Sequence, residues 1–403
     1  MSPIPQHPKS AATIFLDQPP SCLQFCPAAP DNFIIGTYLL SENKDNDGNV
    51  QQTKTGSLQL WNLNPLNNEL SLIQKLSLPY AVFDLHFHPR DASILAIATS
   101  AASVALFKVS TGPETTISHL WDLPVHEDPS TPALFLAWAP QNWFPRREQD
   151  GFAVTFSDGR TSVYGTTSAD KAELTEQSSI IELGTFEATQ TIEVWFVALA
   201  SLRDPSSGSE EPSLPYLFTG DDFGSLHTRQ LSEQAAVEGE EPLAPLVLDY
   251  DDRARHHTGG VTSILPLPLP LSEGAPLLLT GSYDDCLRVY HATRRGQVLA
   301  EECLGGGVWR LQLLKTEQKP ASETEGEEWR FLILASCMHA GTRVVAVTWK
   351  PRRVDDSGSE WSIDVLAQFT EHESMNYASD VWKAEGGYDL EGKDISELFQ
   401  SEA

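Results

Sequence analysis

Hydrophobic and polar residues alternate in short runs along most of the chain, which is the pattern of β-strands with one buried face. Several runs form hairpins of one design, in which a small residue and a glycine lead into an acidic turn and a second strand. The best copy is TGSYDDCLRVYHA, which begins at Thr280 and turns at Asp284 and Asp285. Equivalent positions in three further copies are Thr99, Thr155 and Thr219. The pattern predicts a repeated antiparallel unit.

Successive copies are 56, 64 and 61 residues apart, whereas WD-type propeller blades repeat at about 40–45 residues. The excess lies in runs of Ser, Glu, Pro, Gly and Asp, which bury nothing apolar and cannot offset the entropy lost on ordering. These runs occupy residues 41–55, 203–215, 232–245, 315–329 and 350–360. We therefore expect disordered acidic loop insertions in a β-scaffold.

The repeat predicts an all-β fold, a WD40-type β-propeller of about seven blades. We expect residues 1–403 to form a single domain, with blades over about 11–382 and an acidic tail over 383–403. Propellers close by pairing strands from the two ends of the chain, and residues 12–18 (ATIFLDQ) are the expected N-terminal contribution. The C-terminal segment that would complete this last blade is short.

The chain has 27 basic and 56 acidic residues, a net charge of −29. Such a charge repels phosphate backbones, so we expect no direct nucleic-acid partner and no anionic membrane. No run approaches the roughly 20 apolar residues that span a bilayer, and the N-terminus has no secretory signal. Five scattered cysteines contain no CxxC pair. Together these features predict a cytoplasmic protein with no metal and no cofactor.

Common enzyme signatures are mostly absent. There is no GxSxG elbow, and HESMN resembles the zinc-binding HExxH motif but has Asn376 in place of the second histidine. The repeated acidic turn residues are typical of a scaffold, because aspartate in a tight turn bonds its own backbone. They are Asp221, Asp222, Asp284 and Asp285.

The C-terminal third contains the candidate site, because its motifs depart from the repeat and place polar side chains where a propeller needs simple strand and turn residues. The motifs are GGGVWR, ASCMHAG and HESMNYASD. The candidate catalytic residues are His339, His372 and Ser374, and the candidate substrate-binding residues are Trp309, Arg310, Glu373, Tyr377 and Asp380. The alternative for either histidine is a structural role between blades.

Together with GSYDDCLRVYHATR, these motifs in this order resemble the WD-repeat diphthine methylesterases of diphthamide biosynthesis, in a fungal-like form. The resemblance is specific between about Thr258 and Asp380. Tyr290 and His291 stand where the family has Trp-Asp. The family's closing hairpin, Cys-Ser-Phe-Tyr-Asp ending in Trp, is absent from the sequence, as a truncated gene model would explain.

The resemblance implies a carboxylic-ester hydrolase that removes the methyl ester from methylated diphthine on translation elongation factor 2, enabling the final amidation to diphthamide. That substrate carries a quaternary ammonium, which aromatic faces and carboxylates bind. The acidic surface suits a basic partner, and we expect a monomer. Hydrolysis would use either Ser374, activated by His339 or His372, or a histidine as general base on water, which we prefer. The alternative function is a non-catalytic WD-repeat adaptor in protein trafficking or a ubiquitin-ligase substrate receptor.

Overall fold

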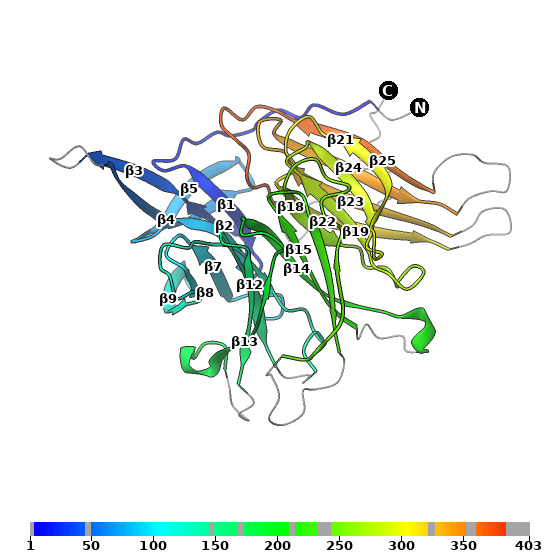
Figure 1. The fold of residues 1–403 in the computed structure, drawn as a ribbon. Coiled ribbons are helices and arrows are strands. Elements are labelled where there is room, and N and C mark those ends of the chain that lie inside the picture. The colour runs from blue at the N-terminus through cyan, green and yellow to red at the C-terminus, as the bar shows by residue number, and fades with distance from the viewer. Residues whose placement is uncertain are drawn as a thin grey trace. The chain divides into compact units, whose positions relative to one another are not determined.

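A computed structural model describes residues 4–44, 50–145, 149–167, 173–208, 214–232, 243–320, 327–351 and 360–383. The described chain forms antiparallel sheets and two short 3-10 turns, η1 (Gln177–Ser179) and η2 (Pro205–Ser207) (Figure 1). It divides into two compact units. The larger comprises Ala11–Asp222 and His227–Asp249, and the smaller comprises Met1–Ser10, Phe223–Leu226 and Tyr250–Ala403.

The larger unit contains four sheets, of which the last ends at the boundary with the smaller unit. The first has the order β1-β2-β4-β3, with β5 also pairing β4, and the other three follow chain order. Their strands are β1 (Pro20–Cys26), β2 (Ala29–Thr37), β3 (Leu39–Lys44), β4 (Val50–Asn64) and β5 (Glu69–Leu78); β6 (Val82–Phe87), β7 (Ile94–Thr99), β8 (Ser103–Thr111) and β9 (Thr115–Pro124); β10 (Ala133–Trp138), β11 (Gly151–Phe156), β12 (Arg160–Thr166) and β13 (Ile180–Glu187); β14 (Val194–Leu202), β15 (Leu214–Asp221), β16 (Leu226–Leu231) and β17 (Leu246–Asp251).

The smaller unit contains two four-stranded sheets, both in chain order. Their strands are β18 (Val261–Pro266), β19 (Leu277–Ser282), β20 (Cys286–His291) and β21 (Gln297–Cys303), then β22 (Arg310–Lys319), β23 (Glu328–Ser336), β24 (Thr342–Trp349) and β25 (Trp361–Phe369). Inward-facing residues of both sheets form one apolar core, which includes Leu279, Val289, Phe331, Ile333 and Val345. The apolar faces of the two sheets are buried in this core, and their burial stabilises the smaller unit.

The four predicted hairpins are confirmed. Thr99, Thr155, Thr219 and Thr280 each lie in the second strand of a four-stranded antiparallel sheet, and the turn that follows leads into the third strand. The predicted class is also confirmed, since such sheets are the blades from which β-propellers are built. Six sheets are present among the described residues, against the expectation of about seven blades. The single domain over 1–403 stays a prediction.

The N-terminal strand expected at residues 12–18 is wrong, because the first strand of the described chain begins at Pro20. The polar end of this segment binds the first sheet through side chains instead. The Gln18 side-chain oxygen accepts hydrogen bonds from the Thr37 and Ser57 hydroxyls, both at 2.8 Å. The terminal contribution lies further upstream, where Gln6 forms a parallel bridge with Ala367 of β25.

The insertion at residues 41–55 is partly a strand pair, which corrects the expectation of a disordered loop. β3 pairs with the first half of β4 from Leu39↔Thr55 to Lys44↔Val50. The insertion at residues 315–329 is likewise ordered at both ends, where Lys319 pairs with Glu328. The centres of all five insertions and residues 384–403 of the expected tail lie outside the described residues. No helix in the described chain is long and apolar enough to cross a membrane.

Candidate functional site

The triple glycine of GGGVWR is explained by packing. A Cβ on Gly306 would lie 2.4 Å from the Cys337 carbonyl oxygen and 2.8 Å from the Ala340 Cβ, so only glycine fits. Gly305 has a positive φ of 86°, which L side chains rarely adopt. Residues 305–307 therefore pack directly against the turn after β23, in which His339 lies.

Three aromatic rings gather where β22 begins. The Trp309 ring centroid lies 5.4 Å from that of Tyr377 and 5.8 Å from that of Tyr283. All three side chains are half-buried, so part of each ring stays accessible. The Trp309–Tyr377 contact brings the motifs GGGVWR and HESMNYASD together in space.

Arg310 packs against one ring of this cluster, that of Trp309. Its guanidinium lies 4.7 Å from the centroid of the Trp309 ring. It also donates hydrogen bonds to the carbonyl oxygens of Thr262 (3.1 Å) and Trp309 (2.8 Å). A cation therefore already occupies one face of the indole, and the predicted role of Arg310 in substrate binding stays a prediction.

A polar network fixes the segment that contains Tyr377. Asn376 is buried and forms a bridge with Met338, in which its amide donates to the Met338 carbonyl oxygen at 3.0 Å. The Asn376 side chain donates to the Thr342 hydroxyl (2.8 Å) and to the Ser379 hydroxyl (3.1 Å). Asn376 stands where the zinc-binding HExxH motif has its second histidine. In the structure, its hydrogen bonds fix the position of the segment that contains Tyr377.

Asp380 is oriented by the neighbouring sheet. Its Oδ1 accepts hydrogen bonds from the Gln312 side chain on β22 and from the Val381 amide, both at 2.8 Å. Gln312 lies two residues beyond Arg310 on the same strand. The carboxylate is thus held in a fixed position by the strand that also carries the arginine.

His372, Glu373 and Ser374 have exposed side chains on the segment before Asn376. The His372 ring packs edge-on against Phe369, with centroids 5.0 Å apart and planes at 90°. Partial burial lowers the pKa of His372 below 6.5. Among the described residues no hydrogen bond joins Ser374 to either candidate histidine, so no nucleophile–base pair is formed.

His339 is exposed in the turn after β23, next to Met338. The bridge between Met338 and Asn376 brings the backbone of this turn beside the segment that contains His372. The described residues include no contact between the two imidazole rings. A shared role for these two histidines stays a prediction.

Tyr283 was missed by the sequence reasoning, although a signal was available. It is an aromatic residue at a turn position where the aligned copy beginning at Thr219 has Asp222. Asn376 and Ser379 were missed because their roles depend on contacts with Thr342, more than thirty residues earlier. Such pairings have no signature in local sequence.

The acidic turns have the scaffold role predicted for them. Asp284 accepts two hydrogen bonds from the Arg288 guanidinium (2.9 and 2.8 Å) and one from the Thr258 amide (2.9 Å). The neighbouring Asp285 adopts a positive φ of 67°, as a tight turn requires. Every oxygen of Asp284 is engaged within the fold.

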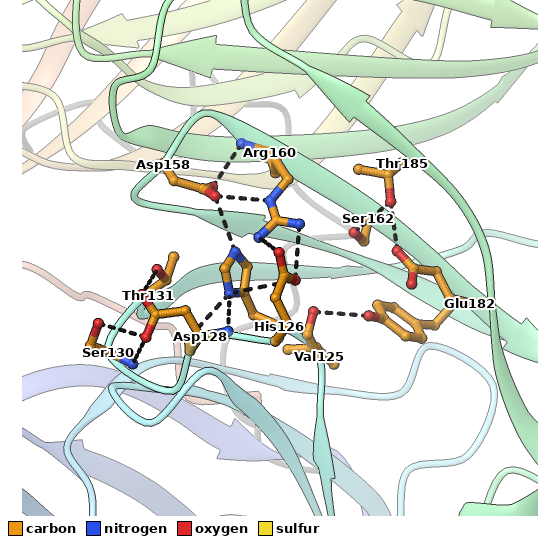
Figure 2. Close-up of polar contacts among 12 residues, drawn as sticks. Val125, His126, Asp128, Ser130, Thr131, Asp158, Arg160, Ser162, Glu182 and Thr185 are labelled. Atoms are coloured by element: carbon orange, nitrogen blue, oxygen red, sulfur yellow. Dashed lines mark hydrogen bonds and ion pairs between the residues drawn. The ribbon is translucent and has the colours of Figure 1, made fainter.

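A histidine–carboxylate cluster lies in the larger unit, outside the candidate site (Figure 2). His126 Nε2 lies 3.0 Å from Asp158, and His126 Nδ1 accepts the Asp128 amide at 2.9 Å. Arg160 donates to the same Asp158 oxygen at 2.8 Å and forms an ion pair with Glu127 at 3.0 Å. Both ring nitrogens are used within the fold, so the cluster braces the turn between β11 and β12.

The fold and the site define a class: an all-β protein built of propeller-type blades, with an aromatic and carboxylate cluster beside β22. No protein-family model matches the chain. It is similar to a protein named diphthine methyltransferase from Schizosaccharomyces pombe, 24% identical over 381 residues, covering 94% of this chain and 92% of that protein. This similarity confirms the resemblance seen in the motifs. The crystal structure of Sqt1 from Chaetomium thermophilum is 13% identical, with a TM-score of 0.48 over 85% of this chain and 84% of that one.

Proposed function

We propose that this protein acts in diphthamide biosynthesis as an esterase that removes the methyl ester from methylated diphthine on translation elongation factor 2. The observation that carries the proposal is the similarity of nearly the whole chain to a protein named diphthine methyltransferase. The motifs that resemble the methylesterase family support hydrolysis as the reaction.

The aromatic cluster supports the location of substrate binding. Tyr283, Trp309 and Tyr377 leave part of each ring accessible, and a trimethylammonium group binds to aromatic faces. The exposed Glu373 carboxylate, four residues before Tyr377, would add electrostatic attraction for that cation. These side chains would orient the substrate without taking part in bond cleavage.

Hydrolysis itself adds water across the ester and yields methanol and a carboxylic acid, which releases its proton to solvent and becomes a carboxylate. His372 suits the role of general base, because partial burial lowers its pKa and so favours the neutral imidazole, the form that can accept a proton. It would take a proton from the attacking water and return it to the leaving methoxide. We favour this route over attack by Ser374, since no histidine hydrogen bonds to that hydroxyl among the described residues.

The name of the relative, diphthine methyltransferase, favours a second candidate, methyl transfer to diphthine. The two reactions change mass in opposite directions, so one experiment distinguishes them. Factor carrying methylated diphthine is incubated with the protein and followed by intact mass spectrometry. An esterase removes about 14 Da without any added donor, which is one methylene equivalent. A methyltransferase adds about 14 Da to unmethylated factor, and only when a methyl donor such as S-adenosylmethionine is present.

A Trp309→Ala variant tests whether the aromatic cluster binds the substrate. We expect it to raise KM more than it lowers kcat, since the indole contacts the substrate cation and not the ester. If the wild-type protein binds the factor at stoichiometric concentration and changes its mass in neither direction, the esterase proposal is wrong and the adaptor function is favoured.

A further inference from the structure

Two cysteines face each other across the last hairpin of the sheet β18–β21. Cys286 begins β20, Cys303 ends β21, and the two are direct partners in the antiparallel register. The Leu304 amide donates to the Asp285 carbonyl oxygen at 2.8 Å, which is the bond that flanks a non-hydrogen-bonded pair. In such pairs the Cα atoms approach to about 4.5 Å and the side chains are closest.

The two sulfur atoms are already in contact, with Sγ–Sγ at 2.7 Å. A disulfide bond measures about 2.05 Å and tolerates Cα separations of about 4.4–6.8 Å, so this strand pair can accept one with little movement. Both residues belong to the smaller unit and to one sheet. The pairing therefore depends only on the register of β20 and β21.

The two cysteines of the pair differ in their exposure to solvent. Cys303 is exposed, whereas Cys286 is buried. The three remaining cysteines, Cys22, Cys26 and Cys337, are buried. An oxidant in solution thus meets one thiol of the pair first and finds the second thiol beside it, which is the arrangement of an oxidisable cysteine with a resolving cysteine.

We propose that Cys286 and Cys303 form a reversible intramolecular disulfide on exposure to hydroperoxides. The location gives this bond a consequence for the candidate site. Cys286 follows Tyr283 by three residues and Cys303 precedes Trp309 by six. A bond between them joins the two segments that present these aromatic rings.

The reaction balances in two steps. The Cys303 thiol is oxidised to a sulfenic acid by the hydroperoxide, which is reduced to an alcohol, or to water in the case of hydrogen peroxide. The Cys286 sulfur then attacks the sulfenic sulfur, and the hydroxyl leaves as water with the Cys286 proton. Burial and the contact with Cys303 raise the pKa of Cys286 above that of an ordinary thiol. The second step should therefore accelerate with pH over the neutral and alkaline range.

The test uses the full-length native protein, treated with hydrogen peroxide, quenched with N-ethylmaleimide after denaturation, and digested for mass spectrometry. We expect a cross-linked peptide joining Cys286 to Cys303, about 2 Da lighter than the two reduced peptides together and absent after dithiothreitol. Cys22, Cys26 and Cys337 serve as internal controls and should be fully alkylated.

Cys303→Ser is the matched variant, because an exposed thiol is replaced by a hydroxyl of similar size. It should abolish the cross-link and leave Cys286 alkylated. Over-oxidation of Cys303 with Cys286 still alkylated would overturn the proposal, and so would a link between two chains or full alkylation of all five cysteines. The result concerns thiols alone, so it stands or fails independently of ester hydrolysis.

Discussion

His339 and His372 are exposed, so their removal tests chemistry rather than folding. A general base contributes about 10²–10⁴-fold to a rate. We expect His372→Ala to lower kcat by that order and to leave the melting temperature nearly unchanged. His339→Ala is the second arm of the experiment, and His119→Ala, on β9 of the larger unit, is the matched control.

The pH profile supplies an independent check on His372. A base acts in its neutral form, and partial burial lowers the pKa of this imidazole. The acid limb of kcat/KM should therefore lie at lower pH than for an ordinary imidazole and disappear in His372→Ala. Full activity in both histidine variants would eliminate the general-base route and direct attention to Ser374.

His257 provides a prediction about stability at the same scale. It is buried, with Nε2 2.9 Å from the Thr280 hydroxyl. Burial, with the nearby Arg288 charge, lowers its pKa from 6.5 to about 3. Between these values the unfolded chain binds a proton that the folded chain does not. Stability must therefore fall as pH decreases through that window, by about 2 kcal/mol between pH 7 and pH 5.

His257→Gln keeps a side-chain hydrogen-bond donor near Thr280 but does not titrate. Urea unfolding at pH 7 and pH 5 should show a smaller loss of stability in this variant than in the wild type, whatever its stability at pH 7. His7→Gln, at an exposed position, controls for the loss of a histidine as such. Equal pH dependence in wild type and His257→Gln would contradict the assignment.

At the scale of elements, the contact between residues 305–307 and the turn after β23 is tested by Gly306→Ala. The added methyl would meet the Cys337 carbonyl oxygen at 2.4 Å, so backbone must move. Overpacking of this kind costs about 1–3 kcal/mol. We expect that loss in the free energy of unfolding, measured with urea. Gly112→Ala is the control, because its Cβ would meet only the Glu114 carbonyl oxygen, at 3.8 Å, and should change stability by less than about 0.5 kcal/mol.

The hairpins were predictable because alternation and a tight acidic turn are local properties. The local sequence around Thr280 indicates a strand, and that around Asp284 indicates a turn. The strand pair β3–β4 was not predictable, because the sequence between Ser41 and Thr55 is mostly polar and shows no apolar alternation. The strand expected at residues 12–18 failed for the converse reason, since alternation there had no partner strand to pair with.

The site was predictable as a set of motifs and not as an arrangement. Trp309 and Tyr377 were chosen because their segments depart from the repeat, and the structure brings them together. The position of Arg310 over the indole and the docking of Asn376 on Met338 depend on backbone approach between distant segments. The periodicity of the sequence carries no information about such contacts between distant segments.

At the scale of the whole molecule, the net charge of −29 makes a prediction about association. Charge of one sign attracts an oppositely charged partner over roughly a Debye length, about 10 Å at 0.1 M salt, and raises the association rate constant 10–10³-fold. If the partner is elongation factor 2 approached through a basic surface, the association rate should fall steeply with salt while the dissociation rate changes little.

Surface plasmon resonance between 50 and 500 mM sodium chloride measures both rate constants. We expect the association rate constant to fall by about tenfold or more over this range. The Glu373→Gln variant shows whether the salt dependence of association arises from this one carboxylate or from the charge of the whole chain. If the field of the whole chain steers association, this variant keeps the salt dependence of the wild type and loses affinity through faster dissociation. An association rate independent of salt would show that the acidic composition, much of it in the insertions, serves solubility and not recognition.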